Sequence, residues 1–284
     1  MIRVATFNIL GPSEDSYVGE DQRISAIVKA LAENHVEVVC LQEVKKIWNN
    51  GRIVHDSEKY FRLQEAYRDS IAITYSDKKP NSQNGEGIVS RFPILEKSST
   101  RLPCLLFGRS CVRVTIDVFG HPLHIISIHL EPPAIGSIVT DYGAEKVTQD
   151  QTRMKQLESL STVINELGNE IPIIIGGDFN LDSGAPAYER WVIQHGLKEL
   201  YPDSSELNRK TFATHPSPNF DCLLQYRYDH LLVRDGEKIS INIKHEGRIF
   251  DKQVGSENEY FYGYLSDHCG LYADFELSKK NESN

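Results

Sequence analysis

Four short segments of this chain end hydrophobic runs in acids, amides or histidines. They are LQEV (41–44), SIHL (127–130), GGDFN (176–180) and SDH (266–268). Catalytic side chains are often carried where a rigid strand runs out into a loop. Carboxylate and amide oxygens bind hard divalent cations, and a cationic imidazole stabilises charge that develops on phosphoryl oxygens. The mixture predicts a hydrophilic metal site suited to a phosphate ester.

Two of these segments carry the candidate metal ligand and the candidate base. Glu43 follows the apolar run VVCLQ and could bind Mg²⁺, or it could be a helix-entry or surface glutamate. Asp178 and Asn180 follow three isoleucines and two glycines. The aspartate could orient or deprotonate a water and the amide could donate to a phosphate oxygen, although an Asx-type turn would explain the same residues.

Asp267 and His268 are adjacent, so on an extended segment their side chains point to opposite sides. Asp267 could then reach a metal while His268 contacts phosphate; the alternative is a simple turn. His129, between two apolar residues, is either a core histidine or part of the site. Asp229 could orient an imidazole, and its neighbour His230 is expected to be structural.

Asn8, at the end of the first apolar run, is either a loop cap or an amide of the site. Hydrophobic runs predict many strands to position these residues. The expected strands are Ile2–Ile9, Val36–Leu41, Ile71–Tyr75, Val112–Val118, Leu123–Leu130, Ile171–Ile175, Tyr228–Val233, Ile239–Ile243 and Leu271–Leu277. FGHPL (119–123) predicts a tight antiparallel connection, and the run of isoleucines at 173–175 predicts a strand covered on both faces.

Three helices are expected outside these strands. One starts at a capping Asp21, one runs from about Asp150 to Gly168, and a short one opens at Pro186 and closes at Gly196. Helices outside many strands indicate an α/β (α+β) four-layer sandwich, in which two face-to-face, mostly antiparallel sheets are flanked by helices.

No repeat or linker divides the chain, so residues 1–277 are expected to form one domain and residues 278–284 a disordered tail. Two long loops are expected beside the chemistry, from Trp48 to Glu58 and from Glu131 to Val147.

Composition narrows the class of protein. The formal net charge of −9 argues weakly against non-specific binding of a polyanion. Five cysteines without a zinc-like spacing favour free thiols and a reducing compartment. The first residues look like a strand and no apolar stretch approaches the length of a membrane span. A cytoplasmic protein, monomeric and without a transmembrane segment, is the expectation.

Taken together and in order, the motifs resemble the endonuclease/exonuclease/phosphatase superfamily, the deoxyribonuclease I-like fold. The matching segments run from Asn8 to His268, almost the whole chain: TFNI (6–9), LQEV (41–44), GIVSRFPI (87–94), SIHL (127–130), GGDFN (176–180), YDHLLV (228–233) and SDH (266–268). His129 resembles the branch that includes deoxyribonuclease I and neutral sphingomyelinases, whereas the exonuclease III branch has another residue there.

The resemblance implies a role for each residue. Glu43 would be the principal ligand of Mg²⁺, or of Mn²⁺ as a substitute, with Asn8 and Asp267 beside it. The implied catalytic residues are Asp178 as activator of water, Asn180 as phosphate holder, His268 oriented by Asp229, and His129. Glu86 would pair with His129. Apart from the resemblance, the aromatic cluster YFYGY (260–264), with Tyr262 as the candidate substrate contact, could stack on bases, touch lipid or pack in the core.

The expected activity is metal-assisted attack of water on a phosphodiester, most readily by a nuclease or an enzyme that processes nucleic-acid ends. A phospholipid or sphingomyelin phosphodiesterase and an inositol-phosphate phosphatase stay open, because a fold does not fix the substrate. A catalytically idle binding module of the same fold is the alternative from another class. The joint presence of six candidate site residues argues against it: Glu43, His129, Asp178, Asn180, Asp267 and His268.

Overall fold

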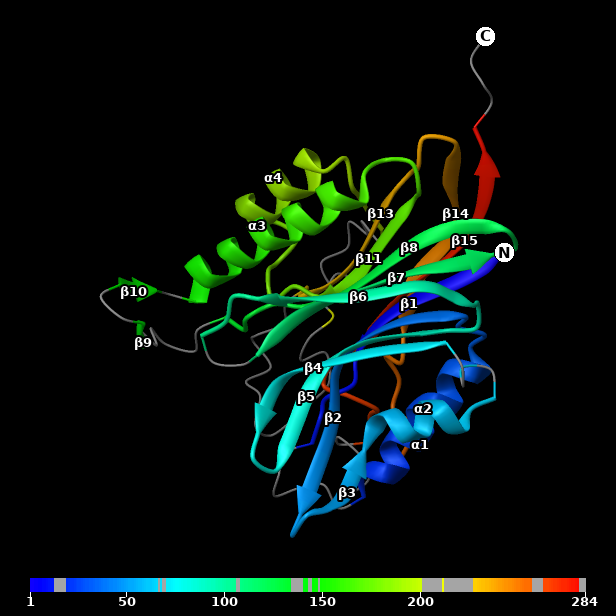
Figure 1. Cartoon of the computed structure of the whole chain (residues 1–284). Coiled ribbons are helices and arrows are strands. Elements are labelled where there is room, and N and C mark those ends of the chain that lie inside the picture. The colour runs from blue at the N-terminus through cyan, green and yellow to red at the C-terminus, as the bar shows by residue number, and fades with distance from the viewer. Residues whose placement is uncertain are drawn as a thin grey trace.

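Two β-sheets pack face to face in the computed structural model of this chain (Figure 1). The structure describes residues 1–12, 19–65, 67, 70–105, 108–133, 140–142, 145–147, 149–200, 211, 227–256 and 263–280. The strand orders are β14-β15-β1-β2-β5-β4, with β3 on β2, and β12-β13-β11-β8-β7-β6. Only β1–β2 and β11–β8 pair in parallel among the described strands, so the expected mostly antiparallel architecture is confirmed.

The bounds of the strands define the two sheets. The first contains β1 (Ile2–Asn8), β2 (Val38–Asn49), β3 (Arg52–Asp56), β4 (Ile71–Lys79), β5 (Ser82–Ser90), β14 (Ile239–Ile249) and β15 (Gly270–Lys279). The second contains β6 (Ile94–Leu102), β7 (Arg109–Val118), β8 (His121–His129), β11 (Ile173–Asp178), β12 (Lys198–Glu199) and β13 (Asp229–Arg234). A small hairpin pairs β9 (Thr140–Tyr142) with β10 (Glu145–Val147).

Helices cover the outer face of each sheet, which makes the four layers (Figure 1). The helices are α1 (Glu20–Glu33), α2 (Ser57–Leu63), α3 (Gln149–Leu167) and α4 (Pro186–Gln194). The isoleucine run of β11 shows why the layers hold together: Ile174 packs in the core between the sheets, whereas Ile173 and Ile175 pack in the core beneath α3 and α4. The expectation of a strand covered on both faces is confirmed.

The expected helices are present, with one change at a cap. The first residue before α1 is Gly19 at φ 86°, and Asp21 lies inside the helix, so the prediction of Asp21 as the cap was wrong. The Asp21 carboxylate instead lies 3.2 Å from His55 Nδ1. The helix α3 ends before Gly168, whose φ of 66° only glycine adopts without strain. None of the described helices is both long and apolar enough to cross a membrane.

The residues of two turns explain why one predicted connection was right and one predicted loop was wrong. Phe119 and Gly120, at φ 54° and 85°, join β7 to β8 as the tight connection that was expected. The loop expected from Trp48 to Glu58 is instead the end of β2, a turn at Asn50-Gly51, β3 and the start of α2. The Asn-Gly pair has positive φ at both residues, which fits the twist of a two-residue hairpin.

Three further predictions need correction. The polar strands β5 and β6 were not expected, because charged and hydroxyl side chains obscure their alternation. The loop expected from Glu131 to Val147 contains the β9–β10 hairpin. The strand β15 continues through Lys279, and the Lys280 N–H donates to Lys238 O at 2.8 Å, so the expected tail boundary falls inside the sheet. Residues 281–284 lie outside the described residues.

Candidate active site

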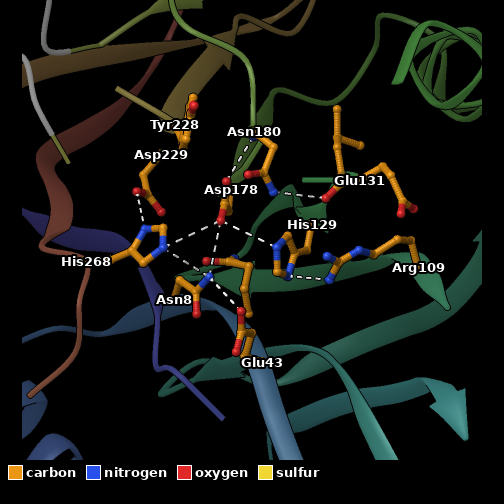
Figure 2. A network of polar contacts seen from close by, with 12 residues as sticks. Asn8, Glu43, Arg109, His129, Glu131, Asp178, Asn180, Tyr228, Asp229 and His268 are labelled. Atoms are coloured by element: carbon orange, nitrogen blue, oxygen red, sulfur yellow. Dashed lines mark hydrogen bonds and ion pairs between the residues drawn. The ribbon is translucent and has the colours of Figure 1, made fainter. Parts of the chain in front are cut away.

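Polar side chains from both sheets meet where β1, β8 and β11 end and β13 begins. In the first sheet, Asn8 ends β1 beside Gln42 of β2. In the second sheet, Asp178 ends β11 and is paired with His129 of β8 on one side and Asp229 of β13 on the other. The Asn8 amide nitrogen lies 3.1 Å from Asp178 Oδ2 and so joins the two sheets. The strand ends therefore deliver these residues to one shared site (Figure 2).

Asp178 is the centre of this network. Its Oδ2 accepts a hydrogen bond from Asn8 and lies 3.4 Å from His129 Nε2 and 3.8 Å from His268 Nε2. Its Oδ1 accepts the backbone N–H of Asn180 at 2.9 Å. That bond closes an Asx-type turn, so the turn and the site, which the sequence offered as alternatives, occur together.

The environment of Asp178 favours a proton acceptor that works near neutral pH. Burial raises the pKa of its carboxyl to about 7, and the charge of Asp229 acts in the same direction. The charge of His268 and hydrogen bonds from Asn180 and Asn8 lower the pKa and so limit the rise. A base whose pKa lies near the working pH is well matched to proton transfer.

His268 is held by carboxylates. Its Nδ1 lies 2.8 Å from Asp229 Oδ2, so the two residues are in the contact that an orienting role of Asp229 requires. Burial lowers the pKa of His268, but the charges of Asp229 and Asp267, the hydrogen bond to Asp229 and the charge of Asp178 together raise it to about 10. The ring is therefore an imidazolium at neutral pH, suited to stabilising negative charge.

Asp267 and His268 do not point to opposite sides. The Asp267 carboxylate lies 3.9 Å from His268 Nε2. The segment turns here, because the His268 N–H donates to Ser266 Oγ and that hydroxyl bonds to Asn8 O at 2.7 Å. The alternation expected of a strand fails at this point, and both side chains face the site.

Glu43 reaches the site through an irregularity in β2. The register of β2 against β5 shifts between Leu41 and Val44, and Glu43 has a φ of 61°. A bulge of this kind re-aims one side chain, and positive φ is uncommon for a residue other than glycine. The Gly11 N–H donates to Glu43 Oε2 at 3.0 Å, and the Asn8 amide lies 3.3 Å from Oε1.

The residues on this side of the site fit a divalent cation. Burial raises the pKa of Asp267, His268 lowers it, and the negative charge of Glu43 raises it again, which shows that the two carboxylates repel each other. A divalent cation held by both would remove that repulsion, and oxygen ligands suit Mg²⁺. Asn8 offers its nitrogen to Glu43 and Asp178, while its Oδ1 accepts the Leu10 N–H.

Asp178, Asp229 and His268 form a second group, whose potential ligand atoms lie within 4.8 Å of one another. A histidine binds metal through a neutral nitrogen, but here Nδ1 is committed to Asp229 and the pKa of the ring is about 10. The group is a hydrogen-bonded ion network, which leaves Glu43 and Asp267 as the carboxylates that fit a cation.

Asn180 is present at the site but is partly committed to the backbone. It has a φ of 49°, and its amide nitrogen donates to Leu130 O at 3.0 Å. An amide group carries two N–H donors, so one remains for a phosphate oxygen. The bond to Leu130 holds the loop after β11 against the end of β8.

The expected pair of Glu86 with His129 was wrong. His129 Nδ1 lies 2.8 Å from Arg109 Nη1 (Figure 2). Glu86 hydrogen-bonds to the hydroxyls of Ser76 and Ser110 instead. Neighbouring strands decide this pairing: Arg109 opens β7, next to β8, whereas Glu86 lies in the other sheet on β5.

Glu86 makes a testable contribution to stability. Burial raises its pKa to about 7, although the bonds from Ser110 and Ser76 and the charge of Arg109 lower it. A carboxyl with a raised pKa stabilises the folded state fully below its unfolded pKa, and this contribution is lost as the pH rises through about 7. We expect this contribution to fall by roughly 3 kcal/mol between pH 5 and pH 8, so the wild type should lose that much more stability over this range than Glu86→Gln.

Urea unfolding of both proteins at the two pH values measures this difference. Glu96→Gln, an exposed change on β6, is the control and should follow the wild type. An equal pH dependence in the wild type and Glu86→Gln would contradict the assignment to Glu86.

His230 has the structural role that was expected. Its Nδ1 lies 2.7 Å from Glu199 Oε1 and its Nε2 lies 2.8 Å from Leu181 O. Its ring packs against Phe179 and Tyr188. These contacts hold the loop that follows Asp178 but do not reach the site.

Sequence reasoning missed the buried arginines that hold the loops of the site. Arg23 of α1 is 1% exposed and donates through Nη1 to Ile9 O and Leu265 O, both at 2.6 Å. These carbonyls adjoin the segments that carry Asn8 and Asp267. The local signal that could have identified Arg23 is its position beside the apolar stripe of α1, because an arginine is seldom buried unless it is paired.

Arg153 of α3 plays the same part on the other side. Its Nη1 donates to Glu131 O at 3.1 Å, and the Glu131 N–H donates to Gln156 Oε1 at 2.9 Å. These bonds fix the chain directly after Leu130, whose carbonyl accepts from Asn180. The remaining expected site residue, Tyr262, lies outside the described residues.

The two-sheet sandwich and the carboxylates, amides and histidines gathered at its strand ends are the features expected of a metal-dependent phosphoesterase. The profile of the Endonuclease/Exonuclease/phosphatase family matches residues 5–268. The chain therefore belongs to the endonuclease/exonuclease/phosphatase family, whose members are hydrolases that act on phosphate esters and depend on a divalent metal.

Similar proteins include one curated relative and several solved structures. The uncharacterized protein YbhP of Escherichia coli is 24% identical over 187 residues, which cover 62% of this chain and 66% of that protein. The mannosyl-6-phosphatase Bt3783 of Bacteroides thetaiotaomicron is 19% identical over 97% of this chain and 100% of its own, with a TM-score of 0.69. TDP2 of D. rerio, complexed with single-strand DNA product, is 19% identical over 97% of this chain and 98% of its own, with a TM-score of 0.67. These structural likenesses support the fold.

Proposed function

We propose that this protein is a Mg²⁺-dependent phosphodiesterase that acts on nucleic acid, as a nuclease or an end-processing enzyme. The observation that carries the proposal is Asp178 itself. Its buried carboxyl faces the imidazoles of His129 and His268. It also accepts a hydrogen bond from Asn8, whose amide contacts Glu43. The proposed base Asp178 therefore lies beside both the carboxylates that would hold a cation and the groups that can donate hydrogen bonds to a phosphate.

The residues divide the work of hydrolysis. Asp178 orients a water and accepts its proton, because its pKa of about 7 permits exchange at neutral pH. His268, His129 and the free N–H of Asn180 stabilise the charge that develops on the phosphoryl oxygens. Glu43 and Asp267 would hold Mg²⁺, or Mn²⁺ as a substitute; when bound, the cation neutralises phosphate charge and polarises the ester. Attack by water needs no covalent nucleophile.

Two arguments favour nucleic acid as the substrate. The family includes many nucleases, and the similar TDP2 structure holds a single-strand DNA product. A phosphomonoesterase is the second candidate, since the mannosyl-6-phosphatase Bt3783 has a similar structure. The two other activities that the sequence left open, hydrolysis of sphingomyelin and of inositol phosphates, are tested in the same substrate panel. An idle binding module would not need the pKa of Asp178 near neutrality.

Paired synthetic substrates test this proposal. We expect hydrolysis of bis(p-nitrophenyl) phosphate with Mg²⁺ and its loss with chelator, and slower hydrolysis of p-nitrophenyl phosphate, a monoester. A panel of single-stranded DNA, plasmid, RNA, sphingomyelin, inositol phosphates and mannose 6-phosphate then identifies the natural class. Cleavage of sphingomyelin or of a sugar phosphate without cleavage of any polynucleotide would overturn the nucleic-acid assignment.

We further propose a cytoplasmic monomer. The four described cysteines, Cys40, Cys104, Cys111 and Cys269, are free thiols, and three of them are buried. Unpaired thiols suit a reducing compartment.

A further inference from the structure

The contact between Arg109 and His129 determines what His129 can do. Arg109 is 4% exposed and His129 is 2% exposed, so neither exchanges its partner freely with water. The guanidinium Nη1 lies 2.8 Å from the ring Nδ1. A guanidinium has N–H donors and no acceptor. The ring nitrogen in this contact must therefore carry a lone pair.

The other ring nitrogen then carries the proton. A neutral imidazole has one N–H, which is placed on Nε2 when Nδ1 accepts. Nε2 is the atom that faces the site, 3.4 Å from Asp178 Oδ2. An N–H in this position can donate to a carboxylate or a phosphate oxygen, but it has no lone pair with which to remove a proton from water.

We propose that Arg109 is a positioning residue that fixes His129 as the neutral Nε2–H tautomer, so that His129 serves phosphoester hydrolysis as a hydrogen-bond donor and neither as a base nor as an imidazolium. The hydrolytic part rests on the proposed function, whereas the tautomer is a property of the folded chain. Transfer of the Nε2 proton would leave an imidazolate, so a departing oxygen cannot take its proton from His129.

The groups around His129 favour the same state. Burial and the positive charges of Arg109 and His268 lower the pKa of His129 well below its ordinary value. The carboxylate that faces the ring, Asp178, is shared with His268. His268 differs because its Nδ1 meets a carboxylate, that of Asp229, and not a cation. The two histidines of the site therefore hold different protonation states, and the partner of Nδ1 decides which.

The tautomer can be measured directly by NMR of the chain labelled with ¹⁵N-histidine. Long-range ¹H–¹⁵N spectra distinguish a protonated from an unprotonated ring nitrogen, and the signal that disappears in His129→Gln identifies the residue. We expect His129 in the wild type to keep an unprotonated Nδ1 and an Nε2–H between about pH 5.5 and pH 8. A protonated Nδ1 at neutral pH, alone or in an imidazolium, would overturn the proposal.

Variants of Arg109 separate positioning from general stability. Arg109→Gln removes the cation and should let His129 gain a second proton at the acid end of this range, with a matching new limb in the pH profile of kcat. Arg109→Lys keeps a donor and should restore the wild-type tautomer. Arg113→Gln, on the same strand and half-buried, is the control and should change neither spectrum nor profile. If Arg109→Gln does not fold, the spectra of the wild type and of Arg109→Lys still show which ring nitrogen of His129 carries the proton.

The donor role also predicts a ranking of His129 variants. Glutamine offers an amide N–H, so His129→Gln should retain more activity than His129→Ala, which we expect to lose about 10²–10³-fold in kcat. Equal losses in the two variants would contradict a donor role. A wild type with the expected NMR spectrum but no phosphoesterase activity would refute the proposed function and leave the tautomer assignment intact.

Discussion

Asp178→Asn is expected to lower kcat by about 10³–10⁴-fold, because the amide cannot accept a proton from the attacking water. The substitution keeps the shape of the side chain and the Oδ1 that accepts the Asn180 N–H. Substrate binding should change far less than turnover. Initial rates with bis(p-nitrophenyl) phosphate at saturating Mg²⁺ measure the effect.

The same substitution should not destabilise the fold at pH 8. The pKa of Asp178 is raised to about 7, so its stabilising contribution is complete below its unfolded pKa and is lost as the pH rises through about 7. Above that pH the wild type carries a buried charge that the Asp178→Asn variant lacks. In the variant an amide nitrogen replaces Oδ2 and loses the hydrogen bond from Asn8, which offsets the gain from removing this charge. Thermal unfolding at pH 8 is therefore expected to show a folded variant close to the wild type in stability.

Asp182→Asn is the matched control for this prediction. Asp182 is exposed in the same loop, and its Oδ1 accepts the Gly184 N–H at 3.1 Å. Asparagine preserves that acceptor, so both activity and stability should stay at the wild-type level. Retention of more than about a tenth of wild-type kcat by Asp178→Asn would rule out a general-base role of the usual size.

Glu43→Gln is expected to raise the Mg²⁺ concentration needed for activity and to lower kcat at saturation by about 10²–10³-fold, as loss of several kcal/mol of charge stabilisation implies. Glu43 is aimed by the bulge in β2 and held by the Gly11 N–H, so the amide can occupy the same place without the charge. Chelation of the wild type should abolish turnover.

Calorimetric titration with Mg²⁺ gives a second measure that does not depend on turnover. We expect weaker binding in Glu43→Gln and unchanged binding in Glu33→Gln, a change of an exposed glutamate in α1. Full activity of the wild type in chelator, or an unchanged Mg²⁺ requirement in Glu43→Gln, would exclude the proposed cation site.

The sequence was most informative where one local pattern decided the structure. Apolar runs located most strands of the two sheets, and the 3.6-residue period together with Gly168 and Pro186 located helices α3 and α4. Polar residues at the ends or starts of such runs then gave the site, since a strand fixes the positions of the residues at both of its ends. Asn8, Asp178 and Asp229 were all found in this way and are in contact through the network of Figure 2.

The errors fall where partners are distant in sequence. Glu86 was expected beside His129, but the packing of β7 on β8 brings Arg109 there. Asp267 and His268 were expected to diverge, but the chain turns at Ser266, whose hydroxyl donates to Asn8 O, 258 residues away along the chain. No periodicity predicts a bulge at Glu43, because the register shift is a property of the pair β2–β5 and not of either strand.

The sequence by itself determined the class of this protein: the order of its strands and helices and the acids, amides and histidines placed at their ends. Only the tertiary structure decided the neighbour of His129, which is Arg109 and not Glu86, and with it the neutral state of that ring. The physical reason is that hydrophobic periodicity is local, whereas burial and charge act through space between segments that the chain brings together from more than 200 residues apart, as in the contact of Asn8 with His268.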